Sequence, residues 1–160
     1  MSRAAFIRQF GAIYEHSPWI AEQAWDRGLS PAHNTVEGLH RLLAEILERS
    51  DHPTQLTLVN AHPDLAGSAA LAGELSPASN AEQAGAGIQH CSAAEFARFR
   101  QLNQAYQAKF GFPFIKAVKG SHREQILAAF EARLQHSPAQ EFQHALAEIN
   151  KIALLRLQTL

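Results

Sequence analysis

The chain has 160 residues, 46% of them hydrophobic, which is long and apolar enough for one folded domain with its own core. Its 14 Lys and Arg residues nearly balance 15 Asp and Glu residues, and the net charge of −1 argues against a nucleic-acid partner. The single cysteine, Cys91, excludes an internal disulfide, and neither a secretory leader nor a membrane-spanning apolar run stands out. We therefore expect one cytoplasmic domain over residues 1–160, with no nucleic-acid or membrane partner.

Helical periodicity accounts for most of the chain. The pairs Ser17-Pro18 and Ser30-Pro31 separate helices that we expect near residues 3–15, 18–28 and 34–49. The last of these has a core-facing stripe with helical spacing. Its apolar residues are Val36, Leu39, Leu43 and Ile46.

Later helix starts carry capping-box signals, in which a serine is followed three residues on by Glu or Gln. The pairs are Ser92 with Glu95, Ser121 with Glu124, and Ser137 with Gln140, the last with Pro138 at the first helical position. No convincing strand alternation competes with these patterns. The predicted fold class is therefore all-α: a single compact multi-helix domain.

Two irregular stretches interrupt the helices, one over residues 51–79 and one over Gly111–Ile115. Loops held on a rigid scaffold often carry function, so chemistry is expected there. The second stretch is unusually apolar for a loop. Phe112 and Phe114 could line a dry pocket or plug the core, and composition leaves both roles open.

His62 precedes Pro63, which biases the His62 backbone toward an extended conformation and limits where the imidazole can point. A fixed imidazole can give or take a proton near neutral pH. The alternative is a loop histidine that only hydrogen-bonds nearby backbone.

Glu82 has two interpretations as well. Ser79 and Glu82 match a capping box, and that role alone would explain the carboxylate. A carboxylate at a helix start could instead orient the ring of His62 or share its proton.

Arg156 falls on the apolar face of the last expected helix, in step with Phe142, Ile149 and Ile152. A buried guanidinium is costly without an anion, so its partner should be an internal acid or a substrate carboxylate. A position near the helix end would also let Arg156 reach solvent. Asn103 lies on another apolar stripe, where a structural hydrogen bond is expected.

A metal site and a thiol nucleophile have less support. There are nine histidines but no His-Glu-x-x-His motif, and the pair considered for a metal site is His144 with Glu148, one helical turn apart. Cys91 has no marked activating partner and is expected to be a small structural thiol. We therefore expect no metal and no thiol chemistry.

Several motifs in this order and spacing resemble one family, the OHCU decarboxylases, which act on 2-oxo-4-hydroxy-4-carboxy-5-ureidoimidazoline. The resemblance runs from about Phe10 through Arg156. The motifs are Tyr14-Glu15-His16-Ser17-Pro18-Trp19, His62-Pro63-Asp64-Leu65-Ala66-Gly67, Glu82-Gln83 with the glycine-alanine run after it, and Asn103 through Lys109-Phe110-Gly111-Phe112-Pro113-Phe114-Ile115. Ser68 and His136 depart from the residues common in the family, lysine and asparagine.

The resemblance implies an all-helical homodimer that decarboxylates this substrate to (S)-allantoin in urate degradation, without metal or organic cofactor. It implies that His62 is the catalytic histidine, Glu82 the partner carboxylate and Arg156 the anion-binding arginine. The same resemblance places other residues around the substrate. These are Pro63, Ser79, Gln83, and the backbone of Phe114, Ile115 and Val118.

Two other functions stay open on the sequence. The apolar loop around Phe112 could bind a protein partner, which predicts no turnover. A metal-assisted hydrolase acting on a related ureide would release ammonia or a urea fragment instead of carbon dioxide.

Overall fold

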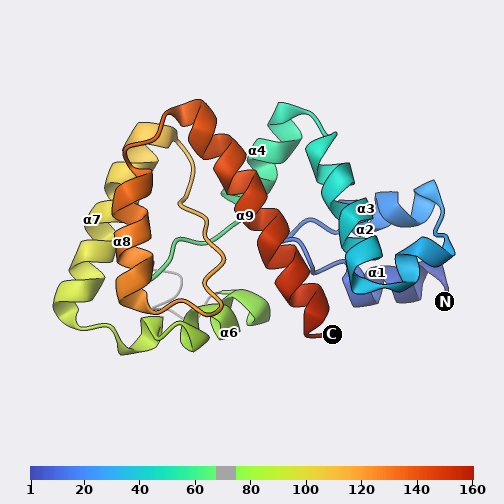
Figure 1. The fold of residues 1–160 in the computed structure, drawn as a ribbon, viewed down its shortest axis with the longest axis horizontal. Helices are drawn as coiled ribbons and strands as arrows, with labels where there is room; N and C mark the ends of the chain where they lie inside the picture. The colour runs from blue at the N-terminus through green and yellow to red at the C-terminus, as the bar shows by residue number, and fades with distance from the viewer. Residues whose placement is uncertain (68–74) are drawn as a thin grey trace. The chain divides into compact units, whose positions relative to one another are not determined.

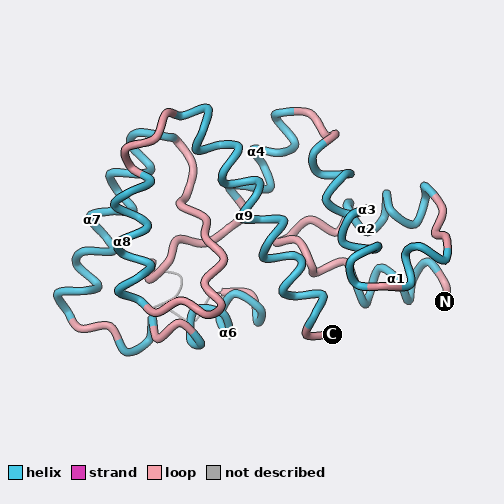
Figure 2. Tube along the Cα trace, viewed as in Figure 1, coloured by secondary structure: helices cyan, strands magenta, loops and turns pink. Residues whose placement is uncertain are grey.

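The computed structural model describes residues 1–67 and 75–160, and every regular element in this part is a helix (Figures 1 and 2). The predicted all-α fold class is therefore confirmed. Ser68 lies outside the described residues. No described helix is both long enough and apolar enough to cross a bilayer. The chain forms two compact units: a first unit of Met1–Ala61 with Ile149–Leu160, and a second unit of His62–Glu148.

The first unit is built from short helices. They are α1 (Arg3–Phe10), α2 (Trp19–Arg27), the 3-10 helix η1 (Pro31–Asn34), α3 (Val36–Glu48), α4 (His52–Asn60) and the end of α9 (Pro138–Gln158). The ring centroid of Phe6 lies 4.8 Å from that of Phe10 and 5.5 Å from that of Trp25, which packs α1 against α2. The α3 stripe is buried as predicted at Leu39, Leu43 and Ile46, whereas Val36 is half-buried.

Helix α4 lies inside the stretch over residues 51–79 that the sequence predicted to be irregular, so that prediction is wrong for residues 52–60. It is also wrong for residues 77–79, because a further helix begins at Pro77. Asp51 caps α4, because its Oδ1 accepts a hydrogen bond from Thr54 N at 2.8 Å. Pro53 lies in the first turn, where its missing N–H costs no helical hydrogen bond. The proline marks a helix start here and not a break.

The second unit holds α6 (Pro77–Gly85), the 3-10 helix η2 (Ile88–His90), α7 (Ala93–Phe110), α8 (Arg123–Arg133) and the start of α9. Helices α7 and α8 pack side by side (Figure 1). Aromatic rings fill much of the space between these elements. Phe114 stacks on Phe130 with 3.8 Å between ring centroids, and Tyr106 meets Phe114 edge-on at 5.4 Å.

The capping predictions for α7 and α9 are confirmed, since both hydrogen bonds of each box are present. The box predicted at Ser121 and Glu124 is wrong by one residue. Helix α8 is capped by His122, whose backbone N–H donates to Gln125 Oε1 at 2.9 Å. A histidine ring nitrogen takes the place of the serine hydroxyl, which residue-type preferences for caps do not anticipate.

Candidate active site

His62 begins the loop that leads away from α4, and its side chain is buried, with 9% of the residue exposed. The loop closes tightly: Ala66 has φ 52°, in the left-handed region that residues with a Cβ seldom adopt. A Cβ on Gly67 would lie 2.8 Å from the Asp64 Cβ, so the turn requires glycine there. The backbone therefore constrains this histidine at the start of a compact loop.

Two side-chain amides from other helices hold this loop in place. Gln83 of α6 accepts a hydrogen bond from Ala66 N at 3.1 Å and donates to Asp64 O at 3.4 Å. Asn103 of α7 donates from Nδ2 to Leu65 O at 3.0 Å, the structural hydrogen bond that we expected for it. Three consecutive residues of the loop are thus bonded to α6 and α7.

Helix α6 carries three of the predicted site residues. It begins at Pro77, and its N-cap is Ser76, whose Oγ accepts from Ser79 N at 3.2 Å. The predicted capping box of Ser79 with Glu82 is therefore wrong, and capping does not explain Glu82. Glu82 is half-buried, while Ser79 and Gln83 are buried one helical turn apart on the same face.

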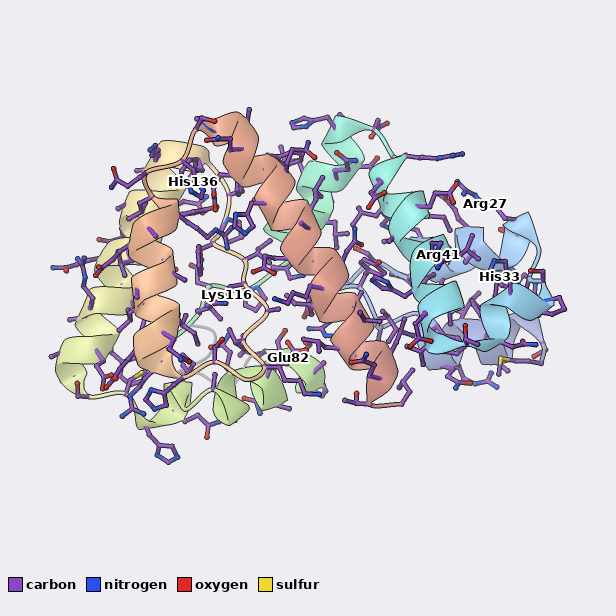
Figure 3. All side chains as sticks on the ribbon, viewed as in Figure 1. Arg27, His33, Arg41, Glu82, Lys116 and His136 are labelled. Carbon is purple, nitrogen blue, oxygen red and sulfur yellow. The ribbon has the colours of Figure 1, made fainter. Side chains whose placement is uncertain are left out.

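The segment after α7 is irregular and buried. Gly111 ends α7 with φ 77°, and the chain then runs without helical structure past Val118. Phe114, Ile115 and Val118 are 1%, 3% and 5% exposed. The Phe112 and Phe114 rings pack against other rings of the second unit, so both contribute to its core. Figure 3 labels Lys116 on this segment and Glu82 on α6.

A buried charge network supports that segment, and no sequence pattern predicted it. The Arg133 guanidinium lies over the Phe114 ring, 4.3 Å from its centroid, and donates to Ile115 O. Its Nε donates to Glu141, which is fully buried. Tyr106 also donates to Glu141, at 2.8 Å, and burial raises the pKa of the Tyr106 phenol, so it stays a donor. Arg133 thereby fixes the backbone of a predicted substrate-contacting residue.

Arg156 belongs to the first unit, with 8% of the residue exposed. Its guanidinium donates to Glu15 Oε2 at 2.9 Å and to Ile13 O at 3.3 Å. Glu15 is itself 3% exposed. The sequence left either an internal acid or a substrate carboxylate open as the partner of Arg156. The structure shows an internal acid, Glu15, in that position.

The predicted site residues fall into two groups by unit. The loop at His62 and Pro63, the α6 residues and the segment over 114–118 all belong to the second unit, and Gln83 bonds α6 to the loop. Arg156 belongs to the first unit, with Glu15.

Two other features bear on the chemistry of the second unit. Burial raises the pKa of the Cys91 thiol, which disfavours the thiolate that a nucleophile needs. An open hollow of about 610 Å³ lies beside the loop and one face of α7. Its described lining includes Asp64, Gly67, Arg100 and Asn103 but not His62 or Glu82.

The chain matches the family model described as OHCU decarboxylase over residues 1–158. It is 42% identical over 153 residues to a 2-oxo-4-hydroxy-4-carboxy-5-ureidoimidazoline decarboxylase of Haloferax volcanii, covering 96% of this chain and 87% of that one. A putative enzyme of the same name from Homo sapiens is 35% identical, with 100% and 91% covered.

Two solved structures are similar as well. One, titled as (S)-allantoin synthase, has a TM-score of 0.79 and 34% identity, with 99% of this chain and 50% of that one covered. The other is an OHCU decarboxylase in the presence of (S)-allantoin, with a TM-score of 0.69, 25% identity, and 88% and 89% covered. By sequence and by fold, this chain belongs to the OHCU decarboxylase family.

Proposed function

We propose that this protein decarboxylates 2-oxo-4-hydroxy-4-carboxy-5-ureidoimidazoline to (S)-allantoin in urate degradation. The observation that carries the proposal is the family match over residues 1–158, which takes in both units. The held loop at His62 adds a physical argument, because a buried imidazole on a constrained backbone suits proton transfer.

The reaction needs proton management more than it needs a covalent intermediate. The bond between the ring carbon and its carboxylate breaks and carbon dioxide leaves. The electron pair forms a double bond to the neighbouring carbon that bears the ureido group, and the ring nitrogen of the former carbon–nitrogen double bond takes up a proton. The resulting enol-like intermediate gains a proton at the carbon that bears the ureido group. The ring hydroxyl then loses its proton and becomes the carbonyl of allantoin.

His62 is proposed to transfer the proton of the substrate's ring hydroxyl, and Glu82 is proposed to orient His62 or the ureido group. The catalytic role of Glu82 has more support than the sequence gave it. Ser76 and not Ser79 caps α6, so the alternative role of Glu82 in a capping box no longer applies. Gln83 ties the backbone of the His62 loop to the helix that carries Glu82, so the two candidates share one local framework. A fixed arrangement of donors lowers the reorganisation needed as charge moves into the ring.

The other residues proposed to contact the substrate, Arg156 excepted, belong to the second unit. Pro63 continues the histidine loop, while Ser79 and Gln83 share a face of α6. The backbone of the 114–118 segment supplies peptide groups for hydrogen bonds to the substrate. Arg133 holds this backbone by donating a hydrogen bond to Ile115 O. The apolar side chains there exclude water, which strengthens electrostatic contacts with the substrate. The contacting residues proposed are Pro63, Ser79, Gln83, Phe114, Ile115 and Val118.

Arg156 is proposed to engage an anionic oxygen of the substrate in addition to its pairing with Glu15. A purely structural Arg156 predicts that Arg156→Leu and Glu15→Gln lose turnover in proportion to the stability they lose. An anion-binding Arg156 predicts a larger fall in kcat/KM for Arg156→Leu than for Glu15→Gln at equal folded fraction. Steady-state kinetics beside urea unfolding of both variants distinguishes the two roles.

The function is tested by adding the native chain to freshly generated substrate and following the circular dichroism of chiral allantoin. We expect the chain to accelerate formation of the (S) enantiomer and the release of carbon dioxide. Release of ammonia or a urea fragment would favour the hydrolase alternative. If the chain accelerates neither reaction, the result would favour the alternative in which the apolar loop around Phe112 binds a protein partner.

We further propose a cytoplasmic homodimer in which residues 1–160 act as one OHCU decarboxylase domain, without metal or cofactor in the reaction. The family match across both units supports the single functional domain. The balanced charge of the chain supports a small-molecule substrate with no nucleic-acid partner. Light scattering of the purified protein tests the dimer, since a monomer mass would contradict it.

A further inference from the structure

Three potential metal ligands converge where α8 meets α9 in the second unit. They are His136, in the loop between the two helices, and Glu141 and His144 in the first turns of α9. Each offers one ligand atom, and these atoms all lie within 4.8 Å of one another. Figure 3 labels His136 beside the start of α9. The sequence had suggested His144 with Glu148 as a pair of ligands, and Glu148 is not a member of this cluster.

The Glu141 carboxylate is already oriented for a ligand on one side. Its Oε1 accepts hydrogen bonds from Tyr106 at 2.8 Å and from Arg133. Its Oε2 lies 3.0 Å from His136 Nδ1 and 3.9 Å from His144 Nδ1. Hydrogen bonds to the far oxygen of a ligating carboxylate are the supporting contacts that well-ordered metal sites use. Tyr106 and Arg133 would supply them here.

The two imidazoles make the cluster accessible to an ion from solvent. The side chains of His136 and His144 are 42% and 41% exposed, whereas Glu141 is buried. Their rings stack with centroids 6.1 Å apart and an interplanar angle of 23°.

The separations are close to those of a filled site. Two atoms bound to one tetrahedral zinc ion at about 2.1 Å lie about 3.4 Å apart. The distances from Glu141 Oε2 to the two imidazoles bracket that value. Rotation of the half-exposed rings would close the remaining gap between them. The positive charge of Arg133 offsets the negative charge of the Glu141 carboxylate. The ion should therefore bind more weakly here than at a site with four protein ligands.

We propose that His136, Glu141 and His144 bind a divalent transition-metal ion, and that Zn²⁺ is the ion this donor set suits best. Two nitrogens and one carboxylate oxygen are a common zinc donor set, with water completing the tetrahedron. The ion would join the α8–α9 loop to the first turns of α9. This site involves none of the residues proposed for decarboxylation.

The proposal is tested by titrating Zn²⁺ into chelator-stripped protein in a calorimeter near neutral pH. We expect one saturable site per native chain and a higher unfolding temperature with zinc present. His136→Asn and His144→Asn should each weaken binding by about tenfold or more, since even supporting contacts are worth that much. His90→Asn is the matched control. His90 is exposed and lies outside the cluster, so its substitution should leave the Kd unchanged.

Absence of saturable binding by the native chain would overturn the proposal. Equal Kd values for the native chain and both cluster variants would overturn it as well, since they would indicate adventitious surface binding. The visible spectrum of Co²⁺ added to the native chain is a second readout that needs no variant. Intense absorption of a four-coordinate ion supports the site, and the weak spectrum of the hydrated ion contradicts it.

Discussion

His62→Ala is expected to lower kcat by roughly 10²- to 10⁴-fold, the usual contribution of a positioned acid–base group, while the chain stays folded. The side chain is buried at the start of a loop that Gln83 and Asn103 hold from two helices. Those amides bond backbone groups of residues 64–66, so the loop keeps its supports when the imidazole is removed. Turnover is measured by circular dichroism of the chiral product.

The control for this prediction is His90→Ala, which removes an exposed histidine from the same unit and should leave kcat unchanged. Far-UV circular dichroism of each variant reports whether its helices are intact. Equal rates of chiral product from the native chain and His62→Ala would remove His62 from the mechanism. A comparable loss in both histidine variants would point to a general effect on folding.

Glu141→Ala is expected to lower the free energy of unfolding by about 3–5 kcal/mol, the usual cost of removing one partner from a buried ion pair. The substitution leaves the Arg133 guanidinium buried without its carboxylate and removes the acceptor of the Tyr106 hydroxyl. Arg133 also holds Ile115 O, so a fall in kcat/KM should accompany the loss of stability. Urea unfolding followed by far-UV circular dichroism measures the change.

Glu131→Ala is the matched control, because Glu131 pairs with Arg98 at 2.8 Å while both side chains are about half exposed, at 50% and 46%. An exposed pair of this kind contributes about 0–1 kcal/mol. If Glu131→Ala and Glu141→Ala lowered the free energy of unfolding by similar amounts, burial would not raise the cost of breaking an ion pair here. That outcome would contradict the proposed importance of the Glu141 network.

Much of the fold could be predicted from short-range patterns. The capping boxes at Ser92 and Ser137 and the buried stripe of the third predicted helix involve residues within a few positions of each other. Such signals depend on backbone geometry that repeats every turn of about 3.6 residues. The sequence-based predictions were wrong where one residue type is compatible with two local structures. Pro53 can start a helix or break one, and His122 can replace the expected serine cap.

The local pattern around Glu82 shows the same limit. Ser79 with Glu82 has the spacing of a capping box, but Ser76, three residues earlier, caps α6. More than one serine near a helix start can serve as the N-cap, and only the backbone conformation decides which of them does. The interpretation of Glu82 therefore depended on where the helix begins.

The order of the amino acids was enough to predict the helical class, the constrained loop at His62 and the need of a buried Arg156 for an anion. It did not identify that anion. Glu15, which pairs with Arg156, lies 141 residues away along the chain, and only the folded chain brings the two side chains together.

The network at Glu141 depended on folding in the same way. Its partners Tyr106 and Arg133 come from α7 and α8, and His136 and His144 meet beside it. Helices form from contacts within about one turn, so their positions can be predicted from neighbouring residues. Buried polar groups instead take their partners from wherever folding brings a matching donor or charge, and these partners appear only in the tertiary structure.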